Sequence, residues 1–280
     1  MDVRLFCFGH AGAGVSSFDR WQQRCGPGVE VVPLALPGRA NRRREPRVTD
    51  RAALLDDLLG TVGAAAESGP YALYGHSLGA LVAHALTRAL LDAGLPAPRL
   101  LAVGACHAPG TAAPAVPRAE QGDDGVLEFV TAAGAAPQGV LAARTGLWHR
   151  TVLPVLRDDL ALARALRAAA AEDLPRALPV PLLAVGADRD PLVDTAALDG
   201  WRDWTRHRFV RRTLPGDHFF QRDPRAPRLI GRACRVTERL AGPGTPTPFP
   251  PTRMSPTRTS RTRTSPTRVS PTRTERSWTA

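Results

Sequence analysis

The chain has no lysine, so arginine supplies all 37 of its basic side chains. We interpret this as the mark of a high-GC gene and not as a functional adaptation. Long apolar runs are also missing, and none approaches the roughly 18 residues that a membrane-spanning helix needs. The segment 1–8 turns polar too early for a signal peptide. These absences argue against a membrane protein and predict a cytoplasmic one.

Cysteine is scarce, and no two cysteines have the Cys-x-x-Cys spacing of zinc sites and redox motifs. The four residues are Cys7, Cys25, Cys106 and Cys234. Three of them lie in apolar segments, where buried and reduced thiols are the usual finding. The sequence therefore predicts neither a metal site nor a disulfide framework.

The net charge of +11 is unevenly distributed. Seven arginines and one acid lie in 242–280, which leaves 30 arginines and 25 acids in 1–241. The same C-terminal stretch repeats Ser-Pro-Thr-Arg at 255–258, 265–268 and 270–273. Its many prolines and few apolar residues predict an unfolded tail after a folded domain of 1–241. We expect no specific nucleic-acid binding, with weak charge-driven binding by the tail as the alternative.

Six short apolar segments alternate with helical patterns along the chain. We predict strands at 3–8, 29–34, 71–74, 100–105, 181–185 and 209–214. We predict helices at 50–66, with Thr49 as the N-cap, at 77–91 and at 224–240. Short apolar strands that alternate with helices indicate an α/β fold, in which helices cover both faces of a mostly parallel sheet.

The stretch 118–176 interrupts this alternation, because it contains only helical patterns. They cover about 123–133, 139–147 and 150–171. An all-helical insert between two core strands is a candidate lid over the C-terminal edge of the sheet, where open α/β folds place their sites. The alternative is additional packing without a gating role.

Gly75-His76-Ser77-Leu78-Gly79 follows an apolar strand and precedes a helix rich in alanine and leucine. A Gly-x-Ser-x-Gly segment in that setting places the serine on a sharp turn, with its hydroxyl above the sheet. The two glycines leave room for the strained backbone. We therefore predict Ser77 as the nucleophile of a serine hydrolase.

A serine nucleophile needs a base and an acid, and in this fold the acid and then the histidine follow it along the chain. His218 directly follows the predicted strand 209–214 and is the predicted base. Asp190 follows the preceding strand and is the preferred acid, because the proline after it favours an extended backbone. Asp188 and Asp194 remain alternatives.

An oxyanion hole needs two backbone N–H groups. One comes from the residue after the nucleophile, Leu78, and the other from the glycine-rich loop 9–14, where Ala11 is the predicted donor. This loop lacks the Lys-Ser/Thr of a P-loop and the spacing of a dinucleotide-binding motif. We therefore do not interpret it as a phosphate-binding loop.

Together these motifs resemble the type II thioesterases of polyketide and nonribosomal-peptide assembly lines, which have the α/β-hydrolase fold. The similar segments are Leu5–Ala13, Leu36–Arg39, Gly75–Ala80, Gly186–Pro191 and Gly216–Phe220. The resemblance extends in order over about 3–240 and also assigns the acid to Asp190. Gly9 and Asp217 stand where that family usually has proline and glycine.

The resemblance implies hydrolysis of acyl groups from the phosphopantetheine thiol of acyl or peptidyl carrier proteins, which edits stalled or misprimed chains. No cofactor of its own is implied, because the partner carries the phosphopantetheine, and we expect a monomer. Carrier proteins are generally acidic, so an arginine run could bind one, or the phosphate of its pantetheine arm, although a solvated loop explains the run equally well. The run comprises Arg39, Arg42, Arg43, Arg44 and Arg47. The alternatives are a carboxylesterase of the same fold and a catalytically impaired homologue that binds carrier proteins.

Overall fold

The structure, a computed structural model, describes residues 2–111, 122–134, 146–172 and 177–242. Contacts within the chain divide it between Pro248 and Phe249, so all described residues belong to the first of two units. The predicted tail beyond Gly242 and most of the predicted helix 139–147 lie outside the described residues.

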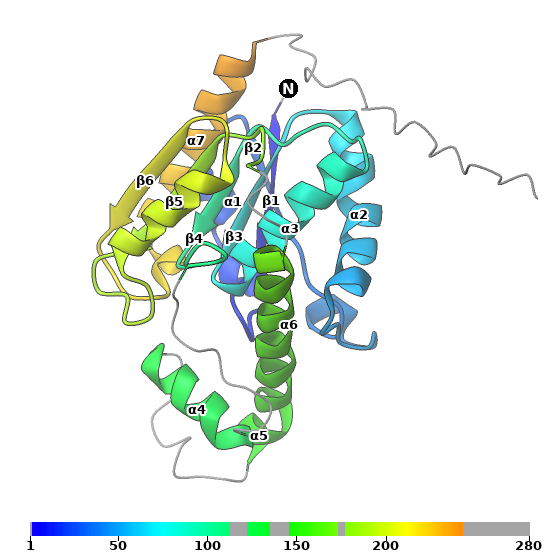
Figure 1. Cartoon of the computed structure of the whole chain (residues 1–280), viewed down its shortest axis with the longest axis vertical. Coiled ribbons are helices and arrows are strands. Elements are labelled where there is room, and N and C mark those ends of the chain that lie inside the picture. The colour runs from blue at the N-terminus through cyan, green and yellow to red at the C-terminus, as the bar shows by residue number, and fades with distance from the viewer. Residues whose placement is uncertain (1, 112–121, 135–145, 173–176, 243–280) are drawn as a thin grey trace, which may run out of the picture. The chain divides into compact units, whose positions relative to one another are not determined.

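Six parallel strands form one sheet in the order β2-β1-β3-β4-β5-β6 (Figure 1). The strands are β1 (Val3–Phe8), β2 (Val29–Pro33), β3 (Tyr71–His76), β4 (Leu101–Gly104), β5 (Leu182–Ala187) and β6 (Phe209–Leu214). All six predicted strands are confirmed. β1 and β3 are neighbours in the sheet although β2 lies between them in the sequence. Open α/β folds bind ligands beside such a reversal of strand order.

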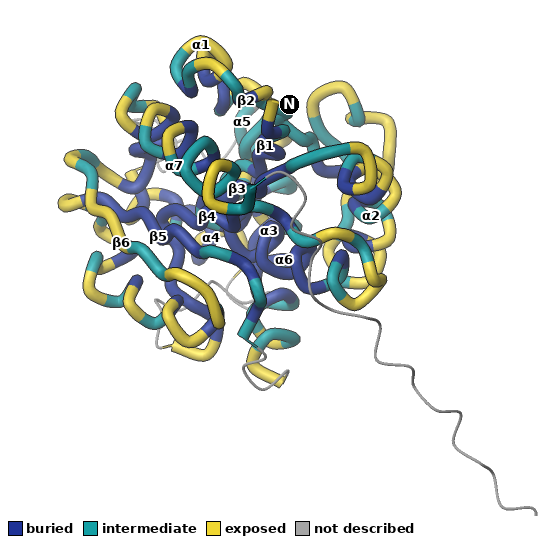
Figure 2. The backbone as a smooth tube through the Cα atoms, turned by 90° about the horizontal axis from the view of Figure 1, so that it is seen from above, coloured by how far each residue is buried: buried dark blue, intermediate teal, exposed yellow. Residues whose placement is uncertain are grey.

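Alternate residues of the inner strands enter two hydrophobic clusters, one on each face of the sheet. In β1, Phe6 and Phe8 belong to one cluster, whereas Leu5 and Cys7 belong to the other. Figure 2 shows the inner strands as buried, and β6 at the edge as partly exposed. This period of two is expected for strands that are covered on both faces.

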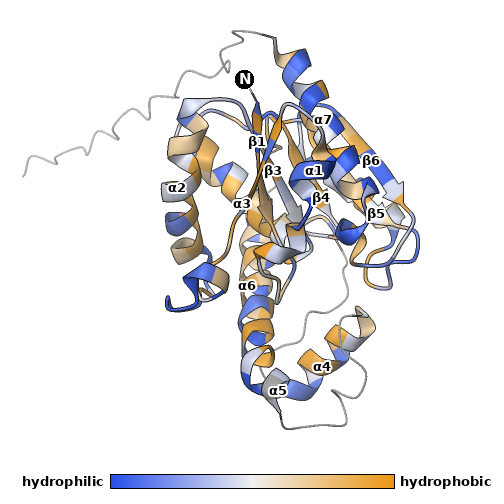
Figure 3. Cartoon of the chain, turned by 180° about the vertical axis from the view of Figure 1, so that it is seen from behind, coloured by the Kyte–Doolittle hydropathy of each residue, from blue (hydrophilic) through white to orange (hydrophobic). Residues whose placement is uncertain are grey.

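Helices cover both faces of the sheet. The first cluster includes α2 (Arg51–Ser68) and α3 (Leu78–Asp92), and the second includes α1 (Trp21–Cys25) and α7 (Arg225–Ala241). Along α7, hydrophilic and hydrophobic residues alternate (Figure 3), and the helix buries one apolar stripe against the sheet. Short 3-10 helices lie at Val15–Phe18, Ala40–Arg42, Thr195–Trp204 and Phe220–Arg222.

The N-cap of α2 differs from the prediction by one residue. The Asp50 carboxylate, and not the Thr49 side chain, accepts the N–H of Ala53 at 2.9 Å. Aspartate and threonine both cap helices well, and only the backbone geometry of the first turn decides between two such neighbours.

The insert between β4 and β5 contains α4 (Gly122–Ala132), α5 (Leu147–Thr151) and α6 (Leu153–Glu172). The predicted helix over about 150–171 is confirmed as α6, which begins three residues later than expected because α5 ends before Val152 and α6 begins after it. α4 and α6 share a third hydrophobic cluster, and Figure 1 shows them beyond the C-terminal ends of the strands. Within the described ranges, no helix has the length and apolar character needed to cross a bilayer.

Candidate active site

Ser77 lies on a tight turn between β3 and α3, at φ 55° and ψ −114°. A Cβ atom on Gly75 would lie 1.9 Å from the carbonyl oxygen of Gly79. A Cβ atom on Gly79 would lie 2.1 Å from the carbonyl oxygen of Phe8 in β1. Both glycines of the motif are therefore required by close approach of backbone, and they seat the turn against the central strands.

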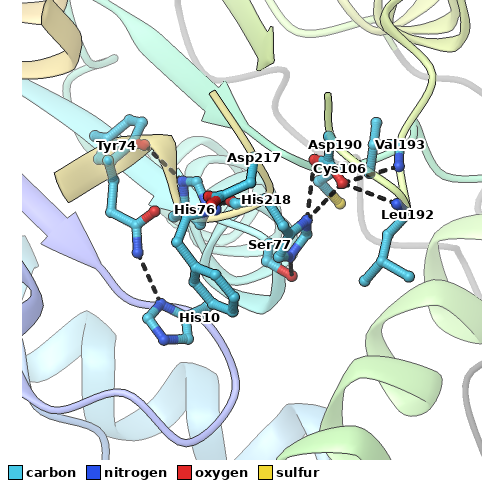
Figure 4. A network of polar contacts seen from close by, with 12 residues as sticks. His10, Tyr74, His76, Ser77, Cys106, Asp190, Leu192, Val193, Asp217 and His218 are labelled. Carbon is cyan, nitrogen blue, oxygen red and sulfur yellow. Dashed lines mark hydrogen bonds and ion pairs between the residues drawn. The ribbon is translucent and has the colours of Figure 1, made fainter. Parts of the chain in front are cut away.

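His218 from a later loop lies against this serine, and Asp190 from another loop lies behind the histidine (Figure 4). His218 Nε2 lies 3.2 Å from Ser77 Oγ. His218 Nδ1 lies 3.0 and 2.9 Å from the two carboxylate oxygens of Asp190. Because an ionised carboxylate only accepts hydrogen bonds, Nδ1 carries the proton, and Nε2 is free to accept from the serine hydroxyl.

The Asp190 carboxylate is fully buried and is held by its own loop. Its Oδ1 atom accepts the N–H of Leu192 at 2.9 Å and the N–H of Val193 at 3.2 Å. Burial alone disfavours an anion, but these donors and the imidazole stabilise it. The same bonds keep the carboxylate facing His218.

The two alternative acids have other partners within the described residues. Asp188 accepts the N–H of Gly216 at 2.9 Å, and its side chain is 48% exposed. Asp194 accepts the N–H of Ala196 at 2.8 Å and caps the 3-10 helix that follows. Of the three candidate acids, the structure brings Asp190 to the histidine.

The two departures from the resembled pattern have local roles. Asp217 accepts the N–H of Phe219 at 2.8 Å and so shapes the turn that carries the histidine. Gly9 begins the glycine-rich loop and allows it to fold tightly, since a Cβ atom there would lie 2.8 Å from Ala13 Cβ.

His76, the residue before the serine, connects two elements of the site. Its Nε2 atom lies 2.7 Å from the backbone carbonyl oxygen of His218, and its Nδ1 atom lies 2.9 Å from the Tyr74 hydroxyl. A carbonyl oxygen only accepts, so Nε2 carries the proton and Nδ1 accepts from the tyrosine. Burial lowers the pKa of His76 well below its usual value, which keeps the ring neutral.

His10, in the glycine-rich loop, is a second neutral histidine. Its Nδ1 atom lies 3.0 Å from Gln221 Nε2, and its ring packs edge-to-face on Phe219 with centroids 4.9 Å apart. Burial, reinforced by the cation of Arg222, lowers the pKa of His10 to about 3. The loop therefore begins at a fixed, uncharged side chain.

Ala11 and Leu78, the predicted oxyanion donors, both line the cavity above the serine. Leu78 begins α3, so its N–H has no acceptor within the helix. The next N–H of the loop, that of Gly12, donates to the carboxylate of Asp159. In the described part of the chain no acceptor contacts the N–H of Ala11, which leaves it available to a ligand.

The cavity in front of the serine is walled by the insert. Leu160, Ala163 and Arg167 of α6 line it together with Phe129 of α4. The Arg167 guanidinium lies 3.5 Å from Cys106 Sγ, and burial raises the pKa of that thiol, so the thiol is neutral. This cation could not be predicted from the sequence, because a charge on an amphipathic helix usually faces solvent.

The predicted arginine run does not form one free basic surface. Three of its members have ion pairs within the chain: Arg39 with Asp159, Arg42 with Glu45 and Asp57, and Arg47 with Asp158. Arg39 is only 10% exposed, so the hypothesis that it faces a partner is wrong. Arg43 and Arg44 are exposed.

All four cysteines are free and buried. Among the residues that the structure describes, no group of three or more histidine, cysteine, aspartate or glutamate side chains is arranged to hold a metal ion.

The parallel sheet, the strained serine turn and the contacts among Ser77, His218 and Asp190 define the arrangement of a serine hydrolase with the α/β-hydrolase fold. Residues 3–234 match the family described as "Thioesterase domain". The chain therefore belongs to this thioesterase family, and the predicted fold and family are confirmed.

Relatives of known pathways support this membership. A cadicidin biosynthesis thioesterase of Streptomyces griseus is 34% identical over 224 residues, which are 78% of this chain and 58% of that protein. The chain thus spans less than two thirds of that relative. Thioesterase PikA5 of Streptomyces venezuelae is 31% identical over 222 residues, covering 79% of this chain and 76% of that protein. RedJ, a thioesterase of the prodiginine pathway of Streptomyces coelicolor, has a solved structure with a TM-score of 0.71 at 33% identity, over 82% of this chain and 90% of that one.

Proposed function

We propose that the protein hydrolyses acyl thioesters on the phosphopantetheine arm of acyl or peptidyl carrier proteins, and that it edits a polyketide or nonribosomal-peptide assembly line. The observation that carries this proposal is the hydrogen-bonded series Ser77, His218 and Asp190 in a chain of the thioesterase family. The relatives named above act in cadicidin and prodiginine biosynthesis, which supports the same setting here.

In the first half of the reaction, Ser77 Oγ attacks the thioester carbonyl carbon while His218 Nε2 accepts the hydroxyl proton. The N–H groups of Ala11 and Leu78 stabilise the negative oxygen of the tetrahedral intermediate. The C–S bond then breaks, the sulfur takes the proton from His218, and the acyl group remains as an ester on Ser77.

In the second half, a water molecule gives a proton to His218 and attacks the ester carbonyl. The C–O bond to Ser77 breaks, the serine oxygen regains the proton, and the carboxylic acid leaves. Asp190 keeps the imidazole oriented and stabilises its cationic form in both halves. Every proton moves among serine, histidine, thiol and water, so the scheme needs no cofactor.

The pocket geometry supports a short acyl group. The cavity beside Ser77 has a volume of about 60 Å³, well below the roughly 300–1,000 Å³ of pockets that take drug-sized ligands. Its mostly apolar wall suits an alkyl chain more than a charged one. On the outer surface, Arg43 and Arg44 offer exposed positive charge to an acidic carrier protein.

The test compares a short acyl group carried on a phosphopantetheinylated carrier protein with the matching simple oxyester. We expect faster release of the acid from the thioester, and we expect Ser77→Ala to lower that rate on the order of 10⁴-fold or more. A faster reaction with the oxyester would favour a carboxylesterase. A fluorophosphonate probe that labels the wild type and Ser77→Ala equally would contradict the role of Ser77.

A further inference from the structure

Helix α6 carries a carboxylate that the proposed reaction does not use. The Asp159 side chain is fully buried, and its Oδ2 atom accepts the N–H of Gly12 at 2.7 Å. Arg39 Nη1 donates to the same oxygen at 2.7 Å, and Arg39 Nη2 donates to Oδ1. Asp159 thus joins α6 to the loops that follow β1 and β2.

The bond to Gly12 bears on the oxyanion donor through peptide geometry. The N–H of Ala11 and the carbonyl of His10 share one planar peptide unit and point in opposite directions. The His10 carbonyl accepts the N–H of Ala13 at 2.9 Å, and Asp159 holds the next peptide unit at Gly12. The direction of the Ala11 N–H therefore depends on a turn that Asp159 fixes.

The same helix also touches this loop through apolar atoms. A Cβ atom on Gly12, which has φ +78°, would lie 2.8 Å from Leu156 Cδ2. Ala11 packs against the cluster to which Leu156 and Leu160 belong. The loop is seated on one turn of α6, and Asp159 lies in that turn.

A buried ion pair is a costly way to hold a helix, because both ions lose their hydration. Burial raises the pKa of Asp159, and Arg39 and the Gly12 N–H act in the opposite direction. Apolar side chains of similar volume often stabilise a fold equally well. They cannot, however, supply a directed acceptor to a backbone N–H, and here that N–H belongs to the oxyanion loop.

We propose that Asp159 is a positioning residue that orients the oxyanion loop from the helix that walls the acyl pocket. This inference rests on the proposed function, since Ala11 acts only where a tetrahedral intermediate forms at Ser77. Arg39 neutralises the carboxylate and fixes its orientation. One turn of α6 thereby sets both the pocket wall, through Leu160, and the oxyanion donor, through Asp159.

The double variant Arg39→Met/Asp159→Leu replaces the ion pair with apolar side chains, which keeps the packing and removes the acceptor for Gly12. We expect a melting temperature near that of the wild type. We expect kcat for a short acyl-pantetheine thioester to fall about 10- to 100-fold, with KM changed by less than about twofold. The isosteric Asp159→Asn keeps one acceptor oxygen and should lose less activity.

A boronic acid that forms a tetrahedral adduct with Ser77 reports on the oxyanion hole directly. Its affinity should fall in the Asp159 variants by about the same factor as kcat, because both depend on stabilising a tetrahedral oxyanion. A purely structural role of Asp159 would not produce this parallel loss.

Asp158 gives the matched control, because it precedes Asp159 on α6 and pairs with Arg47, which lies outside the oxyanion loop. Arg47→Met/Asp158→Leu should change kcat and boronic-acid affinity by less than about twofold. Equal losses in the two double variants, a change confined to KM, or an unchanged boronic-acid affinity would overturn the inference. A wild type that neither hydrolyses thioesters nor binds the boronic acid contradicts the proposed function instead.

Discussion

The imidazole of His76 donates a hydrogen bond from Nε2 to the backbone carbonyl of His218, over 2.7 Å. The residue before the proposed nucleophile thus holds the loop of the proposed base. The ring is neutral, and its other nitrogen accepts the hydroxyl of Tyr74, so a buried series of hydrogen bonds runs from β3 to the loop after β6 (Figure 4).

Replacing His76 with phenylalanine keeps an aromatic ring and removes this donor. We expect kcat to fall about tenfold with little change in KM, because a buried hydrogen bond contributes about 1 to 1.5 kcal/mol and here it orients the base. The control Tyr74→Phe removes only the outer bond and should cost less. Steady-state kinetics on an acyl-pantetheine thioester measure both variants, and an equal fall in the two would contradict the proposed role of His76.

Asp190 and Asp188 provide a matched pair for the assignment of the acid. Asp190→Asn leaves the shape but removes the charge that stabilises the imidazolium, and we expect kcat to fall on the order of 10⁴-fold. Asp188→Asn removes a half-exposed carboxylate that accepts the N–H of Gly216, and we expect kcat to fall less than about tenfold. A larger loss from the Asp188 variant would reverse the assignment.

The contacts that could be predicted from the sequence are those whose residues lie in a recognisable motif or directly after a predicted strand. Ser77 has a motif, and His218 and Asp190 each follow a strand that the apolar pattern marks. Parallel strands bring such loops to one edge of the sheet without any further information. For that reason the order of elements was enough to bring these loops together, whereas the choice of Asp190 over Asp188 and Asp194 is made by the contacts of the structure.

The contacts that the sequence did not predict join segments with no shared pattern. Arg39 and Asp159 are 120 residues apart in the sequence, and the neighbours of each residue indicate only a charged side chain in a polar segment. The arginine run therefore suggested a partner surface, although three of its members find acids within the chain. Only the packing of α6 against the loops after β1 and β2 reveals those pairs.

His84 makes stability depend on pH, because its side chain is buried in α3 between two indole rings. Its ring centroid lies 4.8 Å from that of Trp204 and 5.6 Å from that of Trp201, and its Nε2 atom has no hydrogen-bond partner among the residues that the structure describes. Burial, with smaller contributions from Arg88 and Arg51, lowers the pKa of His84 from 6.5 to about 3.

The sign of the effect follows from this lowered pKa. Above about pH 7 the His84 imidazole is neutral in both the folded and the unfolded chain, so it does not change the free energy of unfolding. Between pH 6.5 and 3 the imidazole is protonated in the unfolded chain and stays neutral in the folded chain, which favours unfolding. Its share of the free energy of unfolding should therefore fall by about 2–3 kcal/mol from pH 8 to about pH 4.5. Urea unfolding at several pH values should show a shallower decline for His84→Leu than for the wild type. Parallel declines would contradict this prediction.

Arg167 places a cation beside the apolar wall of the acyl pocket, and we predict that it limits chain length. A longer alkyl chain in this cavity would displace water from the guanidinium, which lies 3.5 Å from the neutral thiol of Cys106. Arg167→Met removes that penalty and supplies an adaptable apolar side chain. Each CH₂ buried contributes about 0.8 kcal/mol, so two more of them in contact should raise the hexanoyl-to-acetyl ratio of kcat/KM about tenfold or more. Competition assays with the two acyl-pantetheine thioesters measure the ratio.

Arg228→Met is the control for this prediction. Arg228 lies on the exposed side of α7, so its replacement removes the same charge and should leave the ratio unchanged. An equal rise of the ratio in both variants would mean that net charge, and not the pocket, causes the effect.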